Sequence, residues 1–124
     1  MRMTFLPVLA LAAGLLAVTP ADAATINDAK VTAVFAQAVG SNAFGPYVQV
    51  TVRFSKSFGS GCPNQNTDAI YRVYQGSQSR DVDLVALETI RQTALSALLG
   101  SRTVTVVTNS CHDGWHALSS LNLS

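Results

Sequence analysis

The clearest pattern along the chain is an alternation of apolar and polar residues that follows Pro46. Every second residue of 48–54 is Val or Phe, and the residues between them are mostly polar. Because successive side chains of a strand point to opposite faces, this pattern predicts a strand over 47–54 with one buried face. The Val-, Phe- and Ala-rich residues 30–39 predict a first strand. The short turn over 40–45 makes the two strands an antiparallel hairpin.

Three further extended segments follow. A polar loop over 55–68, rich in Ser, Gly, Asn and Gln, precedes a third strand at 69–75. The β-branched residues 102–108 predict a fourth strand, and residues 115–123 predict a fifth with weaker alternation. Residues 109–114 are expected to form the turn between these last two strands.

A helix is predicted between the third and fourth strands, over 81–99, where the apolar spacing changes to the helical period. Asp81 is expected as its N-cap and Gly100 as the residue that follows its end. One broad stripe is expected to lie on the sheet, and it consists of Leu84, Leu87, Ile90, Ala94, Leu95 and Leu98.

The predicted fold class is therefore mainly β with one helix, in the order β-β-β-α-β-β. This is the element order of an OB-like five-stranded small barrel capped by a helix. A ferredoxin-like fold would need a helix between the first two strands, and the connection over 40–45 is too short to hold one.

The N-terminal residues carry the signs of an export signal. Arg2 precedes an apolar run from Phe5 to Val18, and Ala21-Asp22-Ala23 fits the small-x-small cleavage rule. A membrane-spanning helix needs about 20 apolar residues, and this run is shorter and ends near a proline. We therefore expect a signal peptide over 1–23 and a single domain over 24–124. The product is expected to be periplasmic or secreted, without a membrane anchor.

Cys62 and Cys111 are the only two cysteines, and they lie 49 positions apart in the exported part. An oxidising compartment favours a bridge between such a pair, whereas a reactive thiol pair would favour a Cys-x-x-Cys spacing. A structural disulfide is predicted. Charged residues make up only 12% and the net charge is +1, so neither an anionic nor a cationic polymer is an expected partner. The basic residues are scattered, and no nucleic acid is expected.

Four features of the chain resemble a group of small exported bacterial proteins that have an OB-like domain with one disulfide. They are Gly61-Cys62, the Ala- and Leu-rich segment 84–99, the alternating strand from Gly100 to Val106, and the Cys-x-x-Gly at 111–114. The resemblance covers most of residues 29–123, and it implies the fold. More remotely, element order and size resemble the B subunits of AB5 toxins. That resemblance implies glycan binding and assembly into a ring of five.

The residues 109–116 hold the densest group of reactive side chains. His112, Asp113 and His116 are of the residue types that coordinate metals. The two histidines, however, are expected on opposite sides of a turn and not on one face of a helix. Ser110 with His112 and Asp113 would be too close in sequence to act as nucleophile, base and orienting group. No metal, no cofactor and no catalytic residue is therefore expected.

The function expected from the sequence is an exported, non-enzymatic binding module for a glycan or for another exported protein. Homo-oligomerisation through strand edges is also expected. The candidate binding residues, polar amides and acids with one aromatic ring, are Asn64, Gln65, Asn66, Asp113 and Trp115. Two alternatives stay open. The polar loop over 55–68 is an ordinary solvated loop, or Trp115 is a core residue beside the disulfide. The alternative function is a periplasmic inhibitor or accessory subunit that docks on an exported enzyme or envelope complex.

Overall fold

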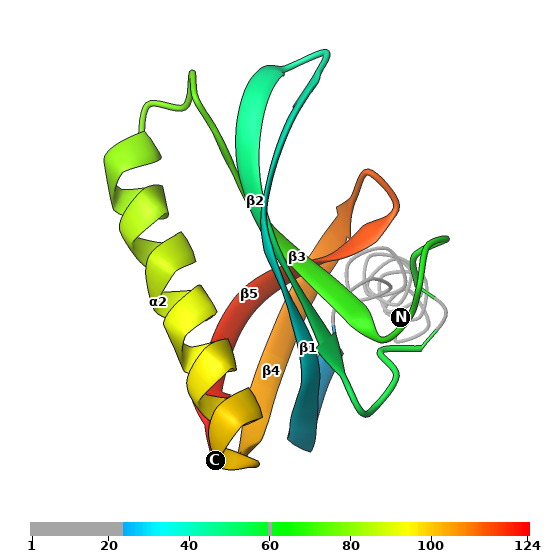
Figure 1. The fold of residues 1–124 in the computed structure, drawn as a ribbon. Coiled ribbons are helices and arrows are strands. Elements are labelled where there is room, and N and C mark those ends of the chain that lie inside the picture. Colours follow the sequence, from blue (N-terminus) through cyan, green and yellow to red (C-terminus); the bar gives the residue numbers. More distant parts are fainter. Residues whose placement is uncertain (1–23, 60) are drawn as a thin grey trace, which may run out of the picture.

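The computed structural model describes residues 24–59 and 61–124, the side chains of 36–38 excepted. The predicted signal peptide, residues 1–23, lies outside the described residues. The described chain is mainly β with one helix, in the predicted order β-β-β-α-β-β (Figure 1). The elements are β1 (Ala24–Asn42), β2 (Gly45–Phe54), β3 (Asp68–Tyr74), α2 (Arg80–Gly100), β4 (Thr103–His112) and β5 (Trp115–Leu123).

The strands form a closed ring in the order β1-β2-β3-β5-β4, which confirms the predicted small five-stranded barrel. All neighbours are antiparallel except β3 and β5, whose short parallel ladder pairs Ala69 with His116 and Ile70 with Ala117. The strand β1 is much longer than predicted. Residues 24–30 pair with β4, residues 31–42 pair with β2, and the register shifts along the way. One strand that bends and serves two neighbours closes the barrel, and hydropathy alone does not reveal that double role.

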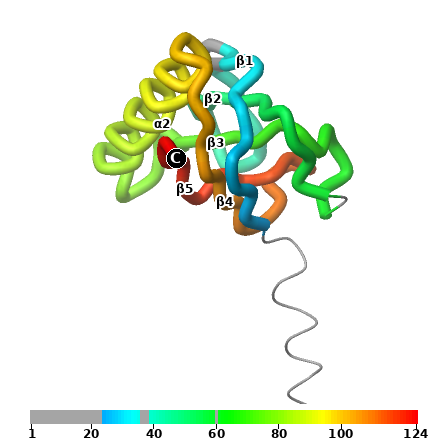
Figure 2. The backbone as a smooth tube through the Cα atoms, turned by 90° about the horizontal axis from the view of Figure 1, so that it is seen from below, coloured from blue at the N-terminus to red at the C-terminus, as the bar shows by residue number. Residues whose placement is uncertain are grey.

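The barrel core follows the alternation of β2, as predicted. Val50, Val52 and Phe54 are buried, and their partners on β3 across the same face include Ala69. Helix α2 lies along one flank of the ring (Figure 2). Its buried residues are Leu87, Ile90, Ala94 and Ala97. Of the predicted stripe, Leu84 and Leu98 are only partly buried against this core, and Leu95 is partly buried as well.

The ends of α2 differ from the prediction. Ser79, not Asp81, is the N-cap, and it makes no side-chain capping bond; Asp81 lies inside the first turn. The chain enters the helix earlier because a tight turn joins Arg80 N to Ser77 O at 3.2 Å. Gly100 is still helical, and Ser101 takes the left-handed conformation at φ 53° instead. Among the described residues, no helix has the length and apolar character needed to cross a bilayer.

The predicted disulfide is present, with the Cα atoms of Cys62 and Cys111 5.7 Å apart. It fastens the loop between β2 and β3 to the end of β4. The loop is also held by Asn64 N, which donates to Gly114 O at 2.9 Å. The same loop therefore has a covalent and a hydrogen-bonded attachment to the β4–β5 hairpin, and this hairpin lies at the site described next.

Candidate functional site

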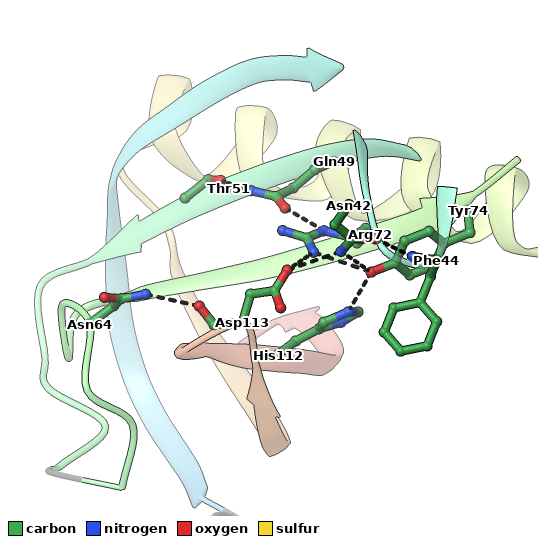
Figure 3. A network of polar contacts seen from close by, with 9 residues as sticks. All are labelled: Asn42, Phe44, Gln49, Thr51, Asn64, Arg72, Tyr74, His112 and Asp113. Atoms are coloured by element: carbon green, nitrogen blue, oxygen red, sulfur yellow. Dashed lines mark hydrogen bonds and ion pairs between the residues drawn. The ribbon is translucent and has the colours of Figure 1, made fainter. Parts of the chain in front are cut away.

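Two tight turns meet at one end of the barrel, beside the last residues of β3. The β1–β2 turn follows Asn42, and the β4–β5 turn consists of Asp113 and Gly114. Asn42 Nδ2 donates to Asp113 Oδ2 at 3.2 Å and so joins the two turns. Around this contact lies a connected group of side chains, here called the rim network; Figure 3 shows all of its members except Tyr47. It consists of Asn42, Phe44, Tyr47, Gln49, Arg72, Tyr74, His112 and Asp113.

Arg72 is the centre of the rim network. It lies on the outer face of β3, where its neighbour across the ladder is Gln49. Its side chain is only 4% exposed, although its guanidinium remains charged. Nε donates to Gln49 Oε1 at 2.8 Å, and Nη1 donates to Asp113 Oδ2. Burial works against the charge, but bonds to Tyr74 and Asp113 outweigh it and raise the pKa of Arg72.

Tyr47 covers the guanidinium of Arg72 from one side. The Arg72 Cζ atom lies 3.8 Å from the centroid of the Tyr47 ring, within the range of a cation–π contact. The ring can lie there because the neighbouring residue on β1 is Gly40. A Cβ at Gly40 would come within 2.5 Å of the Tyr47 hydroxyl. A missing side chain on one strand therefore makes room for the aromatic ring on the next.

Tyr74 joins the two turns through its hydroxyl. The Oη atom accepts from Asn42 Nδ2 at 2.9 Å and from Arg72 Nη1 at 3.3 Å. It also lies 3.0 Å from His112 Nε2. A phenolic oxygen has two acceptor positions and one proton, so with both acceptor positions used it donates to His112. This assigns the remaining imidazole proton of neutral His112 to Nδ1.

His112 and Asp113 have shifted pKa values that fit this arrangement. Burial and the nearby Arg72 lower the pKa of His112, and the Asp113 carboxylate opposes this in part. The hydrogen bond from Arg72 lowers the pKa of Asp113 against a smaller effect of burial. At neutral pH the imidazole is therefore neutral, and the one anion is matched by the one cation. The rim network has no net charge.

The β4–β5 turn is built from Asp-Gly, the sequence that two-residue hairpins with positive φ prefer. Asp113 has φ 53° and Gly114 has φ 85°. Asp tolerates the left-handed region better than most residues, and Gly has no penalty there. The turn is shorter than the predicted 109–114 because β4 continues to His112. This extension is what brings His112 and Asp113 up to the rim.

A hollow of about 420 Å³ opens beside the rim network and is lined by Phe44, Tyr74, Gly76, Ser77 and His112. The rings of Phe44 and Tyr74 are 6.0 Å apart in an edge-on arrangement, and those of Tyr74 and His112 are 5.8 Å apart. Phe44 is 78% exposed. The hollow therefore combines aromatic rings with hydroxyl groups at its edge.

The structure does not bring the five candidate binding residues from the sequence together. Asp113 belongs to the rim network. Asn64 supports the turn from behind, since its Nδ2 donates to Asp113 O at 3.1 Å. Trp115 is half-buried at the start of β5, opposite His112 in the ladder. Gln65 is exposed on the loop. Asn66 turns inward, with Oδ1 3.5 Å from His116 Nε2.

His116 and His112 occupy separate environments. His116 is 1% exposed, with Nδ1 3.5 Å from Cys62 Sγ and its ring 4.9 Å from that of Phe58. His112 faces the rim network instead. Over 24–59 and 61–124, no three His, Cys, Asp or Glu side chains gather as a metal site would require. The hydroxyl of Ser110 bonds to Asn109 Oδ1 at 3.4 Å.

The sequence did not single out most of the rim network. It placed the residues between the apolar ones of 47–54, Tyr47 and Gln49 among them, on the outer face of that strand. On β3, Arg72 and Tyr74 are the residues paired with these two. The missing signal was the pairing of Gln49 with Arg72 and of Tyr47 with Tyr74, because strand register decides which polar residues meet. No protein-family model matches the chain, and no curated protein is significantly similar to it.

Proposed function

We propose that this chain is an exported, non-enzymatic binding module that holds a saccharide at the rim network. The single observation that carries the proposal is the hollow in which the rings of Phe44, Tyr74 and His112 lie beside the hydroxyl group of Ser77. A sugar ring has an apolar face of C–H groups and a rim of hydroxyl groups. Aromatic faces with a few oriented polar groups match both parts.

The electrostatics of the site support a neutral saccharide as the ligand. Arg72 is buried and already paired with Asp113, so its charge is not available to hold a phosphate. The imidazole of His112 is neutral because its pKa is lowered. A single-stranded nucleic acid would need a basic groove along its backbone. Hydroxyl recognition, in contrast, needs only neutral donors and acceptors that are fixed in place. The bonds of Tyr74 Oη are all made within the rim network and orient the His112 ring, whose Nδ1 proton is one such donor.

The place of the rim network in the fold gives further support. In OB-like barrels, ligands often bind on the face of the second and third strands, between the first and last hairpin loops. In this chain that position coincides with a buried cation, an aromatic cluster and the hollow. Assembly into a ring of five rests on the AB5 resemblance alone and stays a prediction.

A glycan array probed with the oxidised protein tests the proposal. Wild-type protein is expected to bind at least one class of neutral glycan. Phe44→Ala should weaken that binding by about tenfold, because it removes one face of the hollow. Phe35→Ala is the matched control: Phe35 is also exposed, at 43%, but it lies over Arg53 and outside the rim network. No binding by wild-type protein, or equal binding by Phe44→Ala, would contradict the proposal.

One observation also favours the second function, docking on another exported protein. Phe44 stands at the tip of the β1–β2 turn with 78% of its surface exposed, and large aromatic side chains of this kind often anchor protein interfaces. An inhibitor or accessory subunit would insert this ring into its partner. Binding to a panel of exported hydrolases, lost in Phe44→Ala and kept in Phe35→Ala, would favour this function if the glycan array is negative.

A further inference from the structure

Helix α2 has an exposed stripe without a single charged residue. The stripe consists of Val82, Val85, Thr89, Gln92, Ser96 and Leu99, all exposed in this structure. Val82 is 72% exposed, Val85 67% and Leu99 82%. A helix on a protein surface normally turns its charged residues to water. In α2, Glu88 and Arg91 instead lie at the side of the stripe and bind each other, with Nε to Oε1 at 2.9 Å.

The spacing within this stripe alternates between three and four residues from Val82 to Leu99. That is the spacing of the a and d positions along the seam of a coiled coil. The inner stripe, from Leu87 to Ala97, has the same kind of spacing and is covered by the barrel. The helix therefore carries two seams on different sides, and the barrel covers only one of them (Figure 1).

The exposed stripe, from here on called the outer stripe, matches a second copy of itself that runs in the opposite direction. A twofold axis between Thr89 and Gln92 would place Val82 opposite Leu99 of a second copy. It would also place Val85 opposite Ser96, so that a larger side chain meets a small one. At the centre, Thr89 would meet Gln92. Thr89 Oγ1 donates to Val85 O at 2.9 Å and can still accept, and Gln92 Nε2 donates one proton to Glu88 Oε2 at 3.0 Å and has a second proton to donate. A symmetric contact of this type uses the same surface on both copies.

The charges at the two ends of α2 favour the same direction. The N-terminal end carries Arg80, Asp81 and Asp83, which sum to a net charge of −1, and the C-terminal end is followed by Arg102. Antiparallel helices bring the negative end of one copy to the positive end of the other, and their dipoles are also opposed favourably. Parallel helices would place like ends together.

We propose that two copies of this chain associate through the outer stripe of α2, with the two helices antiparallel. The sequence led us to expect association through strand edges. In the closed barrel the strands pair with one another, so the contact proposed here uses the helix instead. A helix of 21 residues is about 31 Å long, and one helix pair lies at the small end of stable interfaces. The dimer is therefore concentration-dependent.

Sedimentation velocity of the oxidised protein over rising concentration tests the association. Wild-type protein should change from monomer to dimer. Val85→Lys and Ser96→Glu should each raise the dissociation constant by about tenfold or more, since each breaks a contact in the seam. The double variant should return to within about threefold of wild type, because Lys at 85 then faces Glu at 96 of the other copy.

The matched control is Val39→Lys, a valine that is 75% exposed on β1 and outside the stripe. It should leave the dissociation constant unchanged. Far-UV circular dichroism and thermal unfolding verify that each variant is folded. A monomer at every concentration overturns the proposal, as does an assembly that neither single variant weakens. Failure of the double variant to recover overturns the antiparallel direction, since parallel helices would place Lys against Lys.

Discussion

Arg72 and Asp113 form an ion pair between β3 and the β4–β5 turn, although they are 41 positions apart. The two side chains are unequal in exposure, at 4% for Arg72 and 52% for Asp113. The cation is thus fixed inside the rim network, and the anion reaches it from the turn. The pair holds the turn against the barrel, and it sets the position of His112 next to it in the chain.

Asp113→Asn should lower the free energy of unfolding. The substitution removes the only anion that pairs with the buried guanidinium of Arg72, and it leaves neutral acceptors such as Gln49. Because Asn tolerates a φ of 53° as well as Asp does, the turn itself is preserved. Urea unfolding measures the effect. Asp113→Ala should lose more stability, since it adds backbone strain, and a midpoint equal to wild type in Asp113→Asn would show that the ion pair does not support the turn.

The stability should fall as the pH is lowered below about 6.5, the ordinary pKa of histidine. The folded pKa of His112 is lower than this because of burial and Arg72, so between the two values the unfolded chain binds more protons. By linkage, the free energy of unfolding then decreases as protons are added. Urea unfolding at pH 7.5, 6 and 5 measures the decrease. His112→Asn should reduce it, and an unchanged profile in that variant would assign it to another group.

A second decrease in the free energy of unfolding is expected in more acidic solution. The pKa values of Asp113 and Glu88 are both lowered by hydrogen bonds from arginine, that of Glu88 to about 2. For groups with lowered pKa, the stability is complete above the ordinary pKa and is lost as the pH falls toward the folded value. The loss should begin below about pH 4.5 for Glu88 and below about pH 3.8 for Asp113, the ordinary pKa values of the two groups. Urea unfolding at pH 4 and pH 3 measures this decrease. Glu88→Gln on α2 removes the contribution of Glu88, and Asp113→Asn at the rim network removes that of Asp113, so each variant should show a smaller decrease than wild type.

The barrel was predictable from the sequence because the alternation of β2 and the helical period of α2 are local patterns. The order of elements along the chain and the position of the helix among them followed from these patterns. The rim network was not predictable in the same way. Whether Arg72 meets Gln49 or another residue depends on register, and the contact between Arg72 and Asp113 depends on how far β4 extends before the turn. Tyr47 could be placed over Arg72 only once Gly40 was known to lie opposite it.

Gly114→Ala should destabilise the protein by about 2 kcal/mol or more, for two reasons that can be separated. Its φ is 85°, and a Cβ there would come within 2.7 Å of Asn64 Nδ2. Gly45 also has a positive φ, 103°, but its Cβ would meet nothing within 4 Å, so Gly45→Ala should cost only about 1 kcal/mol. Gly76→Ala, without strain or clash, should change stability by less than about 0.5 kcal/mol. Equal losses at 45 and 114 would show that Asn64 simply moves aside.

Replacing both Cys62 and Cys111 with Ala should cost up to about 4 kcal/mol, since the disulfide closes a loop across 49 positions. The loss should not be uniform over the molecule. The loop between β2 and β3 and the β4–β5 turn lose their covalent attachment, whereas the β1–β2 ladder does not depend on it. Amide hydrogen exchange should therefore increase first in residues 61–67 and 112–115. If the bond only constrains the unfolded chain, exchange in the folded protein will stay unchanged and only the global stability will fall. Increased exchange confined to these two segments would instead mean that the bridge also holds Asp113 in place at the rim network.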